Sequence, residues 1–400
     1  MFPSKPRFLL FTLLIISILI PFYAPAQTFI SDESKEVLKE FELYVAKTTA
    51  ALGSCPVGIV VSRNAKIIFE KYSAGAKRKE SFGPVNKQSL WPIFSATKSF
   101  VAGMLLSLAT DGIIDLDDPV GKYLHEFTTH GNGPYDRRNV TIRHLASHTS
   151  GVSGPEEKQA HYGTPPDLNH VQIDTKPGAE FLYSGLGMHI LERTIQAATG
   201  EDFAETLRKR ILDPLGLKDT LYIYEYNPQL PMLPVRTNNI SDPSGNYSLS
   251  PKAYRAHYGL YATARDVNRY GQLWLGNGTF EGRTYFTPEF KKEAWKYHGT
   301  RASDKGRYGL LWWLFEEEGG YVMSGAGAKA TAVVPETNVV ITVLRIPLEP
   351  NSGPFNFYED KKNLVLFAKK LGECNPTFKK MYEHLPYRDH SAIRTSSLRR

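Results

Sequence analysis

The chain has 400 residues, of which 42% are hydrophobic and 22% charged. This composition is that of an ordinary globular protein and excludes a disordered or fibrous chain. The formal net charge of +7 is concentrated at the ends, because Lys5 and Arg7 contribute +2 and residues 375–400 contribute +4, which leaves +1 for residues 27–374. A nearly neutral body gives no electrostatic reason to expect a nucleic-acid partner.

The N-terminus is predicted to be a secretory signal peptide over residues 1–26. Lys5 and Arg7 precede an apolar run over residues 8–20, and a small-residue exit ends at Ala26. This order of charge, apolar run and small residues is typical of a signal peptide, and the run is short for a membrane span. We therefore expect cleavage after Ala26, a periplasmic or secreted protein, and no stable membrane span after cleavage. An uncleaved anchor is the alternative.

The rest of the chain predicts one α+β domain over residues 27–374 and a basic tail over residues 375–400. Helices are predicted over 33–51, 96–111, 140–146, 187–198, 202–212, 263–275 and 360–371. Two strands joined at residues 63–64 are predicted within 56–72, and single strands over 308–315, 321–324, 329–334 and 339–345. Two stretches, 153–178 and 225–256, are predicted to be irregular. Because strands lie at both ends and helices in the middle, we predict a sheet built from N- and C-terminal segments, with a mostly helical insertion over about residues 100–255.

Export to an oxidising compartment would bear on the redox state of the two cysteines, Cys55 and Cys374. Cysteines can pair in an oxidising compartment. Cys55 precedes the first predicted strand and Cys374 ends the last predicted helix, so a disulfide between them and two separate thiols both stay open. The sequence contains no Cys/His cluster with zinc spacing and no phosphate-binding glycine loop. We therefore expect neither a metal nor a cofactor.

The motif with the clearest chemistry is Ser95-Ala96-Thr97-Lys98, the only Ser-x-x-Lys in the sequence. An apolar helical pattern follows it, so Ser95 and Lys98 are predicted to share a face in the first turn of a buried helix. A lysine amine in that position is able to take the serine proton and so activate the hydroxyl. The motif alone is of low specificity, and an exposed N-cap serine with a solvated lysine is the alternative.

Further blocks follow the Ser-x-x-Lys in a fixed order: residues 114–120, 140–151, 177–184, 213–217 and 261–267. With them the sequence resembles the serine β-lactamase and penicillin-binding-protein-like hydrolases over residues 57–371. The closest resemblance is to the branch that holds class C β-lactamases, related esterases, D-amino-acid peptidases and aminohexanoate-oligomer hydrolases. The resemblance implies a β-lactamase/transpeptidase-like α+β fold with an antiparallel sheet flanked by helices.

The resemblance also implies roles for individual residues. Ser95 matches the nucleophile and Lys98 its partner, and Tyr183 matches the tyrosine of the family's Tyr-Ser/Ala-Asn motif. A phenol close to an ammonium is expected to be partly ionised and to relay protons. The backbone N–H groups of Ser95 and Ala326 are expected to form the oxyanion hole, because such donors need no particular side chain.

Two departures from the family pattern bear on the substrate. The motif asparagine that commonly bonds a substrate amide is Gly185 here, and within the aligned residues 324–329 the cationic third motif is replaced by a neutral Gly-Ala-Gly edge over residues 325–327. Lys329 is close to this stretch but is interpreted as an exposed strand lysine. Without a cation to grip a substrate carboxylate, activity on β-lactams or peptidoglycan peptides ranks below hydrolysis of a neutral ester or amide.

The remaining histidines and tryptophans receive no catalytic role from the sequence. His148 belongs to a structural turn of a family block, and His161 and His170 lie in a loop predicted to vary. The tryptophans are expected mostly to pack in the core or at its rim; they are Trp91, Trp274, Trp295, Trp312 and Trp313.

The sequence thus predicts an exported serine hydrolase that cleaves an ester or amide bond of a small-molecule or short-peptide substrate through a Ser95 acyl-enzyme. Two alternatives remain. One is a β-lactamase, D,D-carboxypeptidase or D-aminopeptidase with the same fold. The other is a catalytically weakened binding module of the cell envelope. The sequence leaves the oligomeric state open.

Overall fold

A computed structural model describes residues 30–75, 84–153, 167–222, 255–300, 307–347 and 355–374. The predicted signal peptide, the basic tail, His161 and much of the two irregular stretches lie outside these residues. Within them, no helix is long and apolar enough to cross a membrane. Residues from Ser31 onward form one compact unit.

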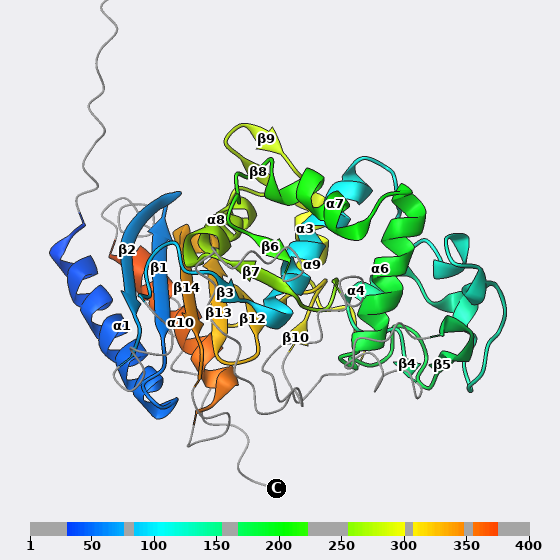
Figure 1. Cartoon of the computed structure of the whole chain (residues 1–400), viewed down its shortest axis with the longest axis horizontal. Coiled ribbons are helices and arrows are strands. Elements are labelled where there is room, and N and C mark those ends of the chain that lie inside the picture. Colours follow the sequence, from blue (N-terminus) through cyan, green and yellow to red (C-terminus); the bar gives the residue numbers. More distant parts are fainter. Residues whose placement is uncertain are drawn as a thin grey trace, which may run out of the picture. The chain divides into compact units, whose positions relative to one another are not determined.

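The main sheet has seven strands in the order β10-β11-β12-β13-β14-β1-β2, and every neighbouring pair is antiparallel (Figure 1). Its strands are β1 (Val57–Arg63), β2 (Lys66–Ser73), β10 (Arg307–Tyr308), β11 (Trp313–Phe315), β12 (Gly320–Gly325), β13 (Lys329–Val334) and β14 (Val339–Arg345). N-terminal β1 pairs directly with C-terminal β14, as the order of predicted strands implied. The prediction of an α+β fold with a sheet from both ends of the chain is therefore confirmed.

Helices cover both faces of this sheet, which explains why β1, β13 and β14 are buried at every residue. On one face lies α8 (Ala264–Leu275), whose Asn268 donates to the carbonyls of Val60 and Val340. On the other lies α10 (Phe357–Glu373), whose Asp360 pairs with Arg345. The first helix, α1 (Asp32–Ala51), packs against α10. A strand that is covered on both faces has a nearly continuous apolar sequence, because neither face contacts water.

The inserted region is mostly helical, as predicted. Its central helix is α3 (Thr97–Thr110), which is buried along all but its last residue, as expected of a helix that is apolar all round. The other helices are α4 (Ile142–Ala146), α6 (Gly185–Thr199), α7 (Phe203–Leu207), which continues as a π-helical turn over Arg208–Leu212, and α9 (Pro288–Ala294). Together with the large sheet they enclose one hydrophobic core.

Short strands were the elements that the sequence pattern missed. A second sheet of order β3-β7-β6 joins Trp91–Pro92, Leu260–Ala262 and Leu221–Tyr222, and two hairpins pair β4 (Val152–Ser153) with β5 (Gln172–Ile173) and β8 (Thr279–Phe280) with β9 (Arg283–Thr284). Two-residue strands carry no alternation that a pattern can detect. The single strand predicted over 308–315 is two strands, because the chain turns between them through Leu311 at φ +61°.

The cysteines do not form a disulfide. Cys55 is a buried thiol, and the Cys374 thiol donates to the Lys370 carbonyl at 3.3 Å. Of the two arrangements left open by the sequence, the structure shows separate thiols.

Candidate active site

Ser95 lies in a tight turn that connects a short strand to the buried helix α3. Strand β3 pairs with β7, and the Ile93 N–H donates to the Leu260 carbonyl at 3.0 Å. Phe94 then takes a left-handed backbone at φ +48°, and a 3-10 turn over Phe94–Ala96 leads into α3. A left-handed backbone is uncommon for a bulky residue and is typical of functional sites. The turn leaves Ser95 partly accessible at the start of the helix.

Lys98 is fully buried one turn along the same helix, so the alternative of a solvated lysine is wrong. Its Nζ donates to the His257 carbonyl at 2.8 Å and lies 4.7 Å from the centroid of the Tyr183 ring. The amine of the Ser-x-x-Lys motif therefore lies beside the ring of Tyr183.

The segment that carries the His257 carbonyl is held by a buried ion pair. Arg255 Nε donates to Glu192 on α6 at 2.8 Å, and the Ala256 N–H donates to the same carboxylate at 3.2 Å. Burial raises the pKa of Glu192, and Arg255 opposes this rise. This pair fixes the residues beside His257 and so fixes the hydrogen-bond acceptor of Lys98.

Tyr183 lies just before α6, and the Ser95 side chain is close enough to its phenol to lower the pKa of that phenol. The residue exposes 41% of its surface, while aromatic rings surround its other side. Burial raises the pKa of the phenol above its ordinary value, and the Ser95 side chain only partly offsets that rise. The direction of this shift favours a neutral phenol over the partly ionised one that was expected, because desolvation opposes ionisation of a phenol.

His148 is a member of the site that the sequence did not assign. It is 1% exposed, and its imidazole centroid lies 4.4 Å from that of Tyr183. Its Nδ1 accepts the Ser184 N–H at 3.3 Å, and burial together with Lys98 lowers its pKa well below the ordinary value. The turn of the His-Thr-Ser-Gly block was the only signal, and it does not show which residue the ring faces.

The strand edge beside the turn that carries Ser95 is the end of β12. A Cβ on Gly325 would lie 2.0 Å from the Ile93 carbonyl oxygen, so only glycine permits this approach. The turn over residues 326–328 follows directly after β12, which contacts the turn that carries Ser95. The assignment of the Ser95 and Ala326 N–H groups to an oxyanion hole stays a prediction that this proximity supports.

Lys329 is not the exposed strand lysine that the sequence suggested. It is 2% exposed, and its Nζ donates to the carbonyls of Ala326 and Gly327 at 3.0 and 3.4 Å. The same ammonium lies 4.7 Å from the centroid of the Phe94 ring. Burial lowers the pKa of Lys329 to about 7. The reason for the error is that β13 is covered on both faces, so a lysine there has no solvated side.

The other residues considered from the sequence divide as follows. Gly185 is buried at the start of α6 and offers only its backbone. His170 is exposed and lies 3.7 Å from Asp167. The expectation of core packing is confirmed for four tryptophans, which are 7% exposed or less: Trp91, Trp274, Trp295 and Trp312.

Trp313 contributes instead to an aromatic wall beside Tyr183. The wall consists of Phe181, Tyr308 and Trp313, with ring centroids 4.9 to 6.0 Å apart. Tyr308 also lies 6.3 Å from Tyr183. Among the described residues, no group of three or more His, Cys, Asp or Glu is arranged to hold a metal ion.

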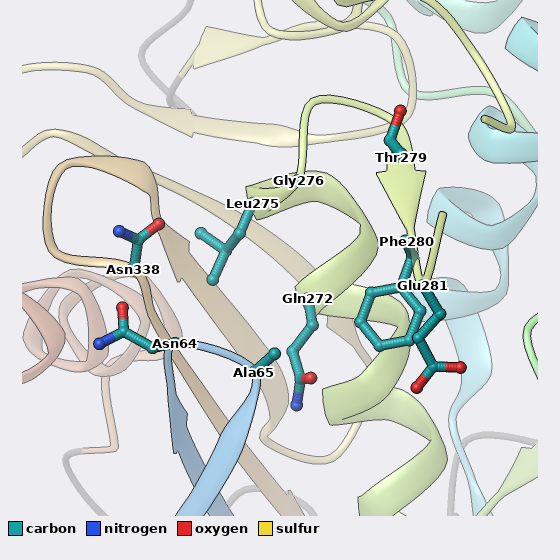
Figure 2. A pocket seen from close by; sticks show the side chains of 9 residues that line it. All are labelled: Asn64, Ala65, Gln272, Leu275, Gly276, Thr279, Phe280, Glu281 and Asn338. Atoms are coloured by element: carbon teal, nitrogen blue, oxygen red, sulfur yellow. The ribbon is translucent and has the colours of Figure 1, made fainter. Parts of the chain in front are cut away.

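A cavity of about 370 Å³ lies away from these residues (Figure 2). It is bounded by the β1–β2 turn, the end of α8 and the β8–β9 hairpin, and its lining includes Asn64, Gln272 and Glu281. None of Ser95, Lys98 and Tyr183 contributes to it. The cavity therefore has no part in the chemistry of Ser95.

Comparison with known proteins agrees with this geometry. The beta-lactamase family model matches residues 47–345, and the chain belongs to that family. An uncharacterised protein of Alkalihalophilus pseudofirmus is 22% identical over 74% of this chain and 86% of its own length. Esterase EstB of Burkholderia gladioli is 27% identical, over 41% of this chain and 46% of its own length, so the chain matches less than half of that esterase.

A solved structure described as EstCE1, a hydrolase with promiscuous acyltransferase activity, superposes with a TM-score of 0.67 at 17% identity. The match covers 84% of this chain and all of that one. At such identity the likeness shows the fold alone, which is the predicted β-lactamase/transpeptidase fold. Because the chain belongs to this family, its site belongs to the serine hydrolase class.

Proposed function

We propose that this protein is an exported serine hydrolase that cleaves a neutral ester or amide bond through an acyl-enzyme on Ser95. The observation that carries the proposal is the convergence of three side chains. The Ser95 side chain is close enough to the Tyr183 phenol to lower the pKa of that phenol, and the buried Lys98 amine lies 4.7 Å from the centre of the Tyr183 ring. Export to the periplasm or the exterior is supported by the charge and apolar pattern of residues 1–26.

The proposed reaction follows from which group holds a proton at each step. Ser95 Oγ attacks the substrate carbonyl carbon while Lys98, as an amine, takes the hydroxyl proton. The backbone N–H groups of Ser95 and Ala326 stabilise the oxyanion. The neutral phenol of Tyr183 gives its proton to the departing alcohol or amine and regains one from Lys98. Water then attacks the acyl-enzyme by the reverse sequence, which frees the acid and restores Ser95.

The charge of the site supports a neutral substrate. At the end of β12, Met323 and Gly325 are buried and Ser324 is uncharged. Lys329 directs its ammonium to backbone carbonyls of the turn. The aromatic wall favours an apolar group on one side of the scissile bond. One relative is named an esterase and one solved structure is described as a hydrolase, and both descriptions agree with this proposal.

The test is mass spectrometry of the protein after treatment with a fluorophosphonate. We expect one adduct on Ser95, no adduct in Ser95→Ala, and an unchanged adduct in the control Ser107→Ala, whose hydroxyl lies farther along α3. Absence of an adduct on wild-type Ser95 would overturn the proposal.

A panel of short-chain esters, D-amino-acid amides and nitrocefin then separates the substrate classes. We expect turnover of esters or amides that Ser95→Ala abolishes. Stable or turned-over labelling of Ser95 by a labelled penicillin would assign the protein to the penicillin-recognising branch instead. Activity that is unchanged in Ser95→Ala would favour a binding module of the cell envelope.

A further inference from the structure

We propose that His148 is a positioning residue that holds the Tyr183 phenol against Ser95. This inference rests on the proposed function, because it concerns the proton carrier of that reaction. It assigns His148 neither proton transfer nor contact with substrate.

The first support is that His148 binds the backbone on both sides of Tyr183. The Leu182 N–H donates to the His148 carbonyl at 2.7 Å, and the Ser184 N–H donates to His148 Nδ1 at 3.3 Å. Residues 180–184 belong to no helix or strand, so no ladder of backbone hydrogen bonds fixes them. One residue therefore anchors the two peptide N–H groups that flank the tyrosine.

The second support is the contact between the rings. The imidazole centroid lies 4.4 Å from the Tyr183 ring at an interplanar angle of 35°. Tyr308 and Phe181 pack against the same imidazole at 5.3 and 6.0 Å between centroids. Since His148 is 1% exposed, its ring has little freedom to move. A fixed ring on one side of Tyr183 limits the directions in which the phenol can swing away from Ser95.

The protonation state of His148 excludes a role as general base. Nδ1 accepts a backbone N–H, so in the neutral imidazole the proton is on Nε2. Burial and the nearby Lys98 keep the ring neutral. With one nitrogen occupied as acceptor and the other protonated, neither has a lone pair for a substrate proton.

Two unfavourable features show that His148 does more than fill space. Its backbone is left-handed at φ +55°, and its buried Nε2 has no hydrogen-bond partner among the described residues. Both features are destabilising. An apolar residue would fill the same volume without the unpaired N–H, but it would not offer the acceptor for Ser184.

The experiment compares His148→Phe with His148→Asn on the best ester of the substrate panel. Phenylalanine keeps a ring beside Tyr183 but has no acceptor, whereas asparagine keeps an acceptor near the Nδ1 position and tolerates a left-handed backbone. We expect kcat to fall about 10- to 100-fold in His148→Phe with KM within about twofold, because small displacements of a catalytic group have effects of that size. His148→Asn is expected to recover most of kcat.

The control is His170→Phe, the same exchange at an exposed histidine, which is expected to keep wild-type kinetics. The pH profile of kcat is expected to keep its shape in His148→Asn, because the imidazole does not titrate in the working range. Circular dichroism of each variant verifies the fold.

Wild-type kcat in folded His148→Phe, or equal losses in both variants, would overturn the inference. So would a changed pH profile in His148→Asn, since that would indicate proton transfer by the imidazole. Fluorophosphonate labelling of wild-type Ser95 keeps the two proposals apart. If wild type is not labelled, the proposed function fails, whereas a labelled and active wild type with a fully active His148→Phe defeats this inference alone.

Discussion

Gly325 and Ile93 are in contact where the main sheet meets the turn that carries Ser95, and a single added methyl group would separate them. A Cβ on Gly325 would lie 2.0 Å from the Ile93 carbonyl oxygen and 3.2 Å from the Phe94 Cβ. Both contacts belong to the chain immediately before Ser95. The distance between the strand edge and the serine therefore depends on the absence of a side chain at this position.

The first prediction is that Gly325→Ala lowers both activity and stability. Relief of a 2.0 Å contact with backbone requires movement of β12 or of the turn that carries Ser95. Overpacking of this kind costs about 1–3 kcal/mol. We expect kcat to fall by about tenfold or more, since the proposed oxyanion donors would move apart. Denaturant unfolding and ester kinetics measure the two effects.

Gly282→Ala is the control. Unlike Gly325, Gly282 has a left-handed backbone, at φ +79°, and no atom of the described residues lies within 4 Å of an added Cβ. Its replacement is expected to affect stability alone, through backbone strain. Normal kinetics in Gly325→Ala would show that the strand edge does not set the geometry around Ser95.

The second prediction concerns the hydroxyl of Tyr183. Tyr183→Phe removes the group beside Ser95 and keeps the ring contacts with His148 and Tyr308. Loss of a positioned proton carrier lowers rates by about 10²- to 10⁴-fold. We expect such a fall in kcat on an ester with a poor leaving group, and a smaller fall on a p-nitrophenyl ester, whose leaving group needs no proton.

Thermal stability distinguishes this fall in kcat from a loss of fold, because Tyr183 is partly exposed and the variant keeps the ring. The midpoint of thermal unfolding is expected to stay within a few degrees of wild type. Equal losses on both esters would contradict a role of Tyr183 in protonating the leaving group.

The fold and the position of Ser95 beside a buried lysine were predictable because their signals are local. Ser95 and Lys98 are three residues apart, with Ser95 in the 3-10 turn that leads into α3 and Lys98 in the first turn of α3, so their proximity follows from local helical geometry. The strands β13 and β14 are apolar runs that a pattern detects without any knowledge of their neighbours. Family blocks in order then supplied Tyr183, which no spacing rule connects to Ser95.

The supporting residues were not predictable because their roles depend on contacts between distant segments. His148 acquires its role only when residues 182–184 fold over its ring and its carbonyl. Lys329 looks like a surface lysine until both faces of β13 are covered. The same holds for the pairing of Glu192 with Arg255, since a glutamate on a helix is exposed in most proteins.

The third prediction addresses that buried pair. The Glu192 side chain is 1% exposed and that of Arg255 is 7% exposed. Removal of one partner of a buried pair costs about 3–5 kcal/mol, because the other charge stays buried. We expect Glu192→Ala to be destabilised by that amount and to lose kcat, since the Ala256 N–H is released and the His257 carbonyl no longer fixes Lys98.

Asp202→Asn provides the comparison. Asp202 also binds Arg255, but its side chain is 44% exposed, and asparagine keeps its capping of α7. Its replacement is expected to cost less than about 1 kcal/mol and to leave kcat unchanged. A Glu192→Ala protein with wild-type kcat at a temperature where it is folded would show that Lys98 does not need this anchor.

The last prediction follows from Lys329, whose pKa burial lowers to about 7. Below pH 7 the native and the unfolded chain both bind the proton, and the native state then holds a buried ammonium. Between pH 7 and the ordinary lysine value of 10.5, only the unfolded chain keeps the proton. Stability rises with pH wherever the unfolded state binds more protons, so Lys329 makes the protein more stable as pH rises through 7.

Lys329→Met is expected to remove this rise, which denaturant unfolding between pH 6 and 8.5 measures as a flatter pH dependence than in wild type. The groups that face the ammonium are Cys55 and Arg345. The raised pKa of Cys55 keeps its thiol neutral in this window, and Arg345 is paired with Asp360. Lys291 and Lys361, with pKa values of about 8, titrate in both proteins and cancel in the difference. If wild type and Lys329→Met gave parallel curves, folding would not lower the pKa of Lys329, and the prediction would be wrong.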